Sequence, residues 1–198
     1  MKVINTKQLS IAVKYLKQGK ILVFPTETSY GLGCDATNQL AVDKIFKIKN
    51  RKSDKPLLVV APTVDMAKKY LVWNELLEGL ANKYWPGALT IVGEYNKKEK
   101  LATGVVSKEN TIAVRVTAYP LLRSIIEKLG RPVVATSANI SDAGDIYEAK
   151  KVIIGFGEAA PDIIIDSGEL PRRLPSTVVS AVGGQLKILR QGELVINI

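Results

Sequence analysis

Short apolar runs alternate with helical patterns along this chain. Runs such as residues 21–24 (ILVF) and 57–60 (LLVV) are rich in branched side chains, which is typical of buried strands. Elsewhere apolar residues recur every three or four positions, the spacing of an amphipathic helix. We expect strands at residues 21–24, 57–60, 89–92, 111–116, 133–136, 163–165, 177–182 and 186–189, and helices at 6–18, 38–48, 63–70, 74–84, 121–129 and 147–156.

This alternation of strands and helices predicts an α/β fold around one sheet. Gly183-Gly184 lies between the last two strand patterns and is typical of a hairpin turn, which would make those strands antiparallel. The sheet is therefore expected to be mixed rather than wholly parallel. No repeat, low-complexity tract or flexible linker divides the sequence, so we treat residues 1–198 as one domain.

Two pairs of polar residues stand where regular elements are expected to end. Lys49 and Arg51 follow the helix at 38–48, and Ser137 and Asn139 follow the strand at 133–136. Residues at i and i+2 of an extended segment point the same way, and ligands of open α/β sheets collect at strand ends. Two cations, a hydroxyl and an amide meeting there would suit a polyphosphate, although either pair alone is typical of an ordinary surface loop.

Arg115 lies inside an alternating strand pattern, on the face opposite Val114 and Val116. An arginine in that position needs a partner, and a carboxylate is the natural one because the guanidinium group can bind it through two hydrogen bonds. The carboxylate could belong to an internal aspartate or glutamate, or to a ligand.

Composition narrows the chemistry. The 198 residues are 46% hydrophobic and 24% charged, as in ordinary globular proteins. They include no histidine, which excludes Ser-His-Asp triads, Cys-His dyads and histidine-ligated zinc. We expect the single cysteine, Cys34, to be a buried side chain rather than a nucleophile. Without a signal-peptide pattern or an apolar run near the roughly 20 residues of a membrane span, we expect a cytoplasmic protein with no membrane partner.

Net charge and glycine patterns bear on the ligand. The chain carries 28 basic and 19 acidic residues, a net charge of +9, which favours anionic partners such as nucleotides or RNA. For most of the lysines, a solvated basic surface is an equally good explanation. Gly31-Leu32-Gly33 is not a dinucleotide fingerprint, because Ala36 takes the third position and no acidic residue ends a second strand. A Walker A motif is also absent, so an ATP site would be built differently from the common phosphate loops.

Seven motifs in a fixed order resemble those of the YrdC/TsaC family of threonylcarbamoyl-AMP synthases, over residues 11–194. They are residues 25–36 (PTETSYGLGCDA), the pair Lys49 and Arg51, residues 55–57 (KPL), 85–87 (WPG), 113–115 (AVR), 136–139 (TSAN) and 175–177 (PST). The resemblance implies a twisted mixed parallel and antiparallel sheet, flanked by helices around a basic concave groove. Because the chain ends soon after Arg190, it resembles the short, single-domain form of the family.

The resemblance also implies a reaction. L-threonine, bicarbonate (or carbon dioxide) and ATP would give L-threonylcarbamoyladenylate and pyrophosphate, which makes the protein a nucleotidyltransferase. The product would serve the threonylcarbamoyladenosine modification of tRNA through a separate transferase complex, with tRNA itself a further candidate partner. Mg²⁺ is expected with the ATP phosphates rather than in a dedicated protein cage.

Site residues are carried over by resemblance alone. The catalytic set is Lys49, Arg51, Ser137 and Asn139; the ATP-binding set is Arg51, Lys55, Thr111, Ser137, Asp145 and Arg190; the threonine-binding set is Thr28, Val60, Arg115, Ala135 and Ser176. Four positions depart from the family's pattern: Lys55 replaces an asparagine, Val60 a histidine, Asp142 a glycine and Asp145 a serine.

Two other functions compete with this interpretation. Charge alone would suit a non-catalytic module that binds double-stranded RNA or tRNA, but RNA affinity would not require the Lys49, Arg51, Ser137 and Asn139 constellation. The second is the related domain of hydrogenase-maturation carbamoyltransferases, whose acylphosphatase and cysteine-rich zinc segments this sequence does not contain.

Overall fold

The computed structural model describes residues 1–52, 54–139, 144–156 and 161–196. Its strands are β1 (Lys2–Asn5), β2 (Leu22–Pro25), β3 (Tyr30–Gly33), β4 (Leu58–Ala61), β5 (Leu89–Glu94), β6 (Thr111–Val116), β7 (Val133–Ser137), β8 (Ile163–Asp166), β9 (Thr177–Ser180) and β10 (Lys187–Arg190). Its helices are α1 (Leu9–Lys17), α2 (Gln39–Lys49), α3 (Val64–Tyr70), α4 (Glu75–Tyr84), α5 (Pro120–Leu129) and α6 (Ala149–Phe156).

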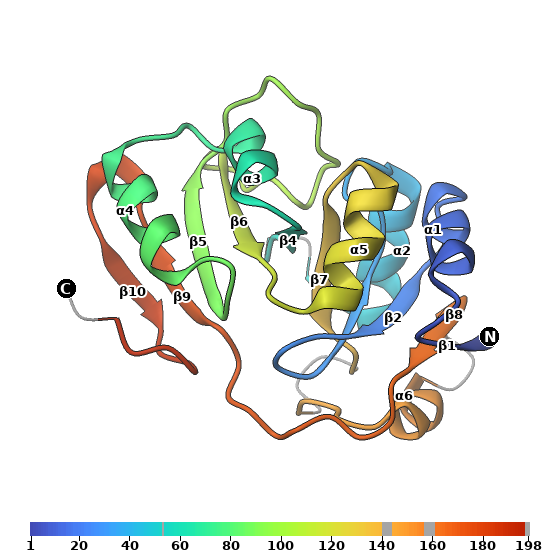
Figure 1. Ribbon diagram of the computed structural model, residues 1–198. Helices are drawn as coiled ribbons and strands as arrows, with labels where there is room; N and C mark the ends of the chain where they lie inside the picture. The colour runs from blue at the N-terminus through green and yellow to red at the C-terminus, as the bar shows by residue number, and fades with distance from the viewer. Residues whose placement is uncertain (53, 140–143, 157–160, 197–198) are drawn as a thin grey trace.

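The described strands form one sheet in the order β1-β8-β2-β3-β7-β4-β6-β5-β9-β10. Strand pairs β1/β8, β2/β8, β4/β6 and β5/β9 are parallel, and the others are antiparallel, which confirms the predicted mixed sheet. In Figure 1, β10, β9, β5 and β6 lie on one side and β2, β8 and β1 on the other, with β4 and β7 between them. The antiparallel pair β4/β7 therefore joins the two halves.

Helices cover the two faces of this sheet unequally. One core cluster combines residues of α1 and α5, such as Leu16 and Ile125, with Phe24 and Val133 from the strands beneath. Residues of α2, α3, α4 and α6 belong to the other cluster. On the first face, α1 and α5 pack against each other beside β2 and β8 (Figure 1), and in the described part of the chain their core cluster includes no residue of the β6–β5–β9 region. The candidate site lies in that region.

Local sequence signals account for most of the predicted elements. Asn38, Thr63 and Asn74 begin α2, α3 and α4, and the side chain of each accepts a hydrogen bond from a backbone N–H of the first turn. The Gly183-Gly184 hairpin is confirmed, since both glycines have positive φ (64° and 73°) between the antiparallel strands β9 and β10.

The predicted elements differ from the structure in three places: the start of one helix and two strands that were not predicted. The first helix begins at Leu9 after Gln8 rather than at Thr6, and Gln8 makes no side-chain cap. The sequence did not predict β1, an edge strand with one buried side chain, Ile4. It also missed β3, because two of its four residues are glycines, which weaken a strand pattern.

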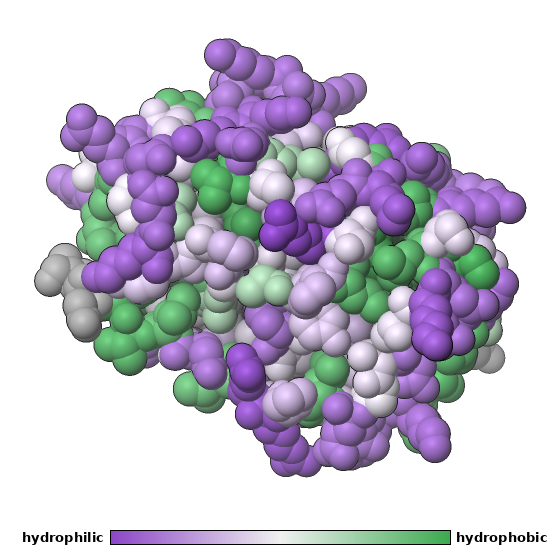
Figure 2. All heavy atoms as spheres, viewed as in Figure 1, coloured by the Kyte–Doolittle hydropathy of each residue, from purple (hydrophilic) through white to green (hydrophobic). Residues whose placement is uncertain are grey.

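Hydrophilic side chains cover much of the face seen in Figure 2 and separate scattered apolar areas. In the described part of the chain, each helix is too short or too polar to span a lipid bilayer.

Candidate active site

A cavity of about 430 Å³ opens on the sheet beside the α1–α5 core cluster. Strands β4, β5, β6, β7 and β9 supply its floor, and the β2–β3 turn and the segment before β9 supply its walls. Residues predicted for the site that line it are Thr28, Arg51, Arg115, Ala135, Ser137, Asp145, Ser176 and Arg190.

A second hollow of about 280 Å³ adjoins the first, because Arg51, Thr136 and Ser137 line both. Its other lining residues include Lys49, Lys52, Lys55 and Asn139. Of the described residues that line the two hollows, Asp145 alone is acidic. The combined site is therefore strongly basic and suits an anionic ligand.

Lys49 fastens the end of α2 to the end of β7. Its ammonium donates to the backbone oxygens of Ser137 (2.7 Å) and Asn139 (2.8 Å), and to Asn139 Oδ1 (2.8 Å). Ser137 Oγ donates to the same Oδ1 at 2.7 Å. The helix can stop at Lys49 because Asn50 takes the left-handed conformation (φ 48°, ψ 41°). The structure thus brings together the two pairs of polar residues that the sequence singled out.

Arg51 lies at the junction of the two hollows. Its Nε donates to the Lys55 carbonyl at 2.9 Å and its Nη2 to the Pro56 carbonyl at 3.1 Å, which holds the loop before β4. Burial lowers the pKa of Arg51, with Asp54 acting in the opposite direction, but a guanidinium group stays protonated in proteins. Arg51 therefore presents a fixed positive charge to both spaces.

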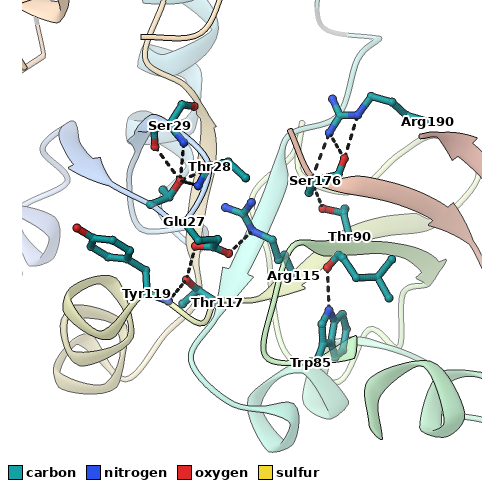
Figure 3. A network of polar contacts seen from close by, with 12 residues as sticks. Glu27, Thr28, Ser29, Trp85, Thr90, Arg115, Thr117, Tyr119, Ser176 and Arg190 are labelled. Atoms are coloured by element: carbon teal, nitrogen blue, oxygen red, sulfur yellow. Dashed lines mark hydrogen bonds and ion pairs between the residues drawn. The ribbon is translucent and has the colours of Figure 1, made fainter. Parts of the chain in front are cut away.

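Arg115 is buried in the cavity wall with Glu27 as its internal partner. Arg115 Nε lies 3.5 Å from Glu27 Oε1, and the Thr117 hydroxyl donates to Glu27 Oε2 at 2.9 Å (Figure 3). The terminal nitrogens of Arg115 make no hydrogen bond within the described ranges and border the cavity. The sequence left open whether the partner of Arg115 is an internal carboxylate or a ligand. Both fit the structure, because Glu27 faces Nε and the other nitrogens have space for a ligand carboxylate.

The β2–β3 turn holds Thr28 at the cavity edge. Thr26 Oγ1 donates to the Ser29 carbonyl at 2.7 Å and accepts from the backbone N–H groups of Thr28 and Ser29 at 3.1 and 3.2 Å. It also lies 3.1 Å from the Thr28 hydroxyl. Such side-chain-to-backbone bonds fix a short turn, so the Thr28 side chain has a defined position.

Ser176 is held from two sides. Its hydroxyl lies 2.9 Å from Thr90 Oγ1, and Arg190 Nη2 donates to its carbonyl at 2.8 Å and to its hydroxyl at 3.2 Å (Figure 3). Burial lowers the pKa of Arg190; Asp145 opposes that effect and Arg115 adds to it. Arg190, expected beside the nucleotide, is thus bonded to a residue expected beside threonine.

Two predicted site residues, Val60 and Thr111, are not among the described residues that line either hollow. Val60 is fully buried in the α1–α5 core, in register with Arg115 on the next strand. The Thr111 hydroxyl lies 2.9 Å from Ser107 Oγ, and Thr111 is not among the described residues that line either hollow. Asp142, which the sequence analysis named only as a departure from the family's pattern, lies outside the described residues.

Sequence reasoning missed Glu27 and Thr90. A buried arginine implied some carboxylate partner, but nothing local indicated Glu27, which is 88 positions away from Arg115 (115 − 27). Thr90 stands out only as a polar residue between Leu89 and Ile91, and in a strand it must face the opposite side.

A family comparison tests the resemblance carried by the seven motifs. The model of the Sua5, YciO and YrdC proteins, described as "Telomere recombination", matches residues 14–192. The chain belongs to the Sua5/YciO/YrdC family. The family predicted from the seven motifs is thereby confirmed.

Individual members of the Sua5/YciO/YrdC family agree in sequence and fold. The threonylcarbamoyl-AMP synthase of Vibrio vulnificus is 35% identical over 189 residues, 93% of this chain and 98% of that protein. That of Pyrococcus abyssi is 35% identical over 191 residues, 94% of this chain but 54% of the relative, so this chain spans about half its length. The structure of P. abyssi Sua5 complexed with L-threonine matches with a TM-score of 0.88 and 32% identity, over 97% of this chain and 58% of that one.

Proposed function

We propose that this protein is an L-threonylcarbamoyladenylate synthase that joins L-threonine, bicarbonate (or carbon dioxide) and ATP and releases pyrophosphate. The observation that carries the proposal is the pairing of two adjoining hollows. One presents the terminal nitrogens of Arg115, and the other is lined by Lys49, Arg51 and Lys55. An amino acid and a triphosphate would therefore meet at Arg51. The names of the relatives support the same reaction.

The larger hollow suits threonine. Arg115 would bind the carboxylate with its terminal nitrogens, because a guanidinium fork matches a carboxylate in geometry and charge. The hydroxyls of Thr28 and Ser176, on opposite walls, would bind the polar groups of the amino acid. Ala135 and Leu58, neighbours in register on β7 and β4, give a small apolar floor. An L-threonine complex of a relative supports this assignment.

The smaller hollow suits the phosphates of ATP. Arg51 and Lys55 would neutralise their charge, while Ser137 and Asn139 would hold the phosphates and their ion through oxygen atoms. Lys49 would act mainly by holding Ser137 and Asn139 in place, since its ammonium already bonds to both. Arg190 and Asp145 also line the larger hollow, into which the rest of the nucleotide would extend.

Mg²⁺ would enter with ATP. Within the described ranges, no three His, Cys, Asp or Glu side chains converge into a ligand set, but Ser137 Oγ and the Asp145 carboxylate are hard oxygen donors of the type that Mg²⁺ takes alongside phosphates. The ion would supply further charge neutralisation on the phosphates.

The chemistry needs positioning more than acid–base catalysis. The threonine amine would capture carbon dioxide as a carbamate, and a carbamate oxygen would then attack the α-phosphorus as pyrophosphate leaves. Holding these groups in line and stabilising the phosphate charge can be done by arginine, lysine and hydroxyl groups, without histidine. The product would pass to a separate transferase complex that modifies tRNA, in the cytoplasm.

Pyrophosphate release tests this function. Protein is incubated with ATP, Mg²⁺ and bicarbonate, with L-threonine, with D-threonine or with no amino acid. We expect release that depends on both L-threonine and bicarbonate. Folded protein that releases no pyrophosphate with L-threonine would overturn the proposal, and salt-sensitive RNA binding by the same sample would then favour the non-catalytic RNA-binding module.

A further inference from the structure

The Glu27–Arg115 pair joins two parts of the sheet that are not adjacent. Glu27 lies in the turn between β2 and β3, whereas Arg115 lies on β6, and strands β7 and β4 separate β3 from β6 in the sheet. Both side chains are nearly buried, with exposed fractions of 11% for Glu27 and 5% for Arg115. A buried charge is stable only when another charge or a hydrogen-bonding group compensates it.

Glu27 is fixed at one oxygen and faces arginine with the other. Oε2 accepts the Thr117 hydroxyl at 2.9 Å, and Thr117 Oγ1 in turn accepts the backbone N–H of Tyr119 at 3.1 Å. Oε1 faces Arg115 Nε at 3.5 Å, and among the described residues neither of these two buried atoms has a hydrogen-bond partner. That separation is longer than the roughly 2.7–2.9 Å of a charge-assisted hydrogen bond.

This arrangement decides which nitrogens of Arg115 are available to a ligand. Since Glu27 faces Nε, the guanidinium group is turned so that its terminal nitrogens border the cavity, between the β2–β3 turn and Ser176 (Figure 3). Glu27 is also the chain neighbour of Thr28, whose hydroxyl lines the same cavity. One ion pair therefore links Arg115 to the turn that carries Thr28, and both residues line the threonine hollow.

We propose that Glu27 is a positioning residue for the amino-acid substrate. Fixed by Thr117, it orients Arg115 toward the substrate carboxylate and keeps the Thr28 turn close to β6. This inference rests on the proposed function. It differs from a purely structural ion pair, because it requires that the effect of Glu27 on threonine binding acts through Arg115.

A double-mutant cycle separates the two roles. Glu27→Gln keeps the side-chain size but removes the charge, and we expect it to raise the threonine KM on the order of tenfold, because a buried arginine loses the charge that compensates it. The ATP KM should change by less than about twofold. In an Arg115→Ala background, the same Glu27→Gln change should alter the threonine KM by less than about twofold.

Two matched controls accompany the cycle. Glu127→Gln removes the carboxylate of the exposed Arg123–Glu127 pair on α5 and should behave as the wild type. Thr117→Val removes the hydroxyl that holds Glu27 and should raise the threonine KM, whereas Thr117→Ser keeps the donor and should restore it. The Thr117 variants also test the inference if Glu27→Gln does not fold, which thermal unfolding of each variant shows.

The outcomes are distinct. Wild-type protein that neither binds L-threonine in calorimetry nor turns it over would overturn the proposed function, and this inference with it. Wild-type turnover with an unchanged threonine KM in Glu27→Gln, or in Thr117→Val where Glu27→Gln is unfolded, would overturn the inference alone. So would an equal increase in both KM values, or a tenfold effect of Glu27→Gln that persists in the Arg115→Ala background.

Discussion

Lys49 is only 2% exposed, whereas lysine is among the residues least often buried. Its close acceptors include backbone and side-chain oxygens of Ser137, at the end of β7, and Asn139, just after it, so its charge is compensated by groups that belong to the candidate site. Arg115 is buried in a similar way, with its compensating carboxylate on the neighbouring turn. At the scale of single residues, the site is built from buried cations whose positions are fixed before any ligand binds.

The first residue-scale prediction concerns Arg115. Arg115→Ala removes the guanidinium group proposed to bind the substrate carboxylate, so the threonine KM should rise roughly 10- to 150-fold, as for one hydrogen bond to a charged group. Steady-state kinetics with each substrate varied in turn should show a much smaller change for ATP. Arg123→Ala, an exposed arginine on α5, serves as the control. Equal losses for both substrates would refute the assignment.

Cys34 provides a second prediction. The side chain is fully buried, and burial first, then the nearby Asp35 carboxylate, raises the pKa of the thiol well above its ordinary value. The thiolate is the reactive form, so Cys34 should not react with an aromatic disulfide reagent at neutral pH until the protein is denatured. Rapid stoichiometric reaction of the native protein would show that this part of the core opens.

At the scale of elements, helices were predicted from local signals that strands lack. Capping residues such as Asn38 and Asn74 lie within four positions of the N–H groups they bind, so the sequence displays them directly. Strand β3 depends instead on close backbone approach between distant segments. A Cβ atom on Gly33 would lie 1.9 Å from the Val134 carbonyl oxygen, and no pattern around Gly33 reveals that neighbour.

Two glycine substitutions test whether Gly33, unlike a glycine in a helix, is required by close backbone approach. Gly33→Ala should destabilise the fold by at least about 1–3 kcal/mol, the usual cost of overpacking, because backbone atoms block the added methyl group. In Gly79→Ala, on α4, the added methyl group has no neighbour within 4 Å, so this variant should stabilise the fold by about 0.5–1 kcal/mol. Denaturant unfolding measures both. Equal stability of the two variants would contradict the close approach of β3 and β7.

Asp162, just before β8, bonds to α2 and to the residue before β2, and its carboxylate makes the stability of the fold depend on pH. Burial alone would raise its pKa, but the Ile21 N–H (2.8 Å) and the Lys44 ammonium (2.8 Å) outweigh it and hold the pKa below its ordinary value of 3.8. A lowered folded-state pKa stabilises the protein above the unfolded-state pKa, and the benefit is lost as pH falls through the folded-state value.

The variant Asp162→Asn should therefore be less stable than the wild type near neutral pH, with a difference that shrinks below about pH 4. Unfolding of both proteins by urea across this range measures the difference. A gap that stays constant or widens at low pH would show that the carboxylate is not held in its charged form.

At the scale of the whole molecule, the site gathers residues that lie far apart in the chain. Thr28, Arg115 and Ser176 reach one cavity from the β2–β3 turn, β6 and the segment before β9. Strand and helix patterns predicted the class of fold, but they could not show this convergence, which depends on sheet order. The ordered motifs of the family supplied it instead. Glu27 and Thr90, which support Arg115 and Ser176, became visible only in the structure.

The most direct test of the proposed reaction follows the carbon atom of bicarbonate into the product. Protein is incubated with ATP, Mg²⁺, L-threonine and ¹³C-labelled bicarbonate, and the adenylates are analysed by mass spectrometry. The account predicts an adenylate that contains both threonine and the labelled carbon, and that disappears when either is omitted. An adenylate that lacks the label, or ATP consumption that does not depend on threonine, would contradict it.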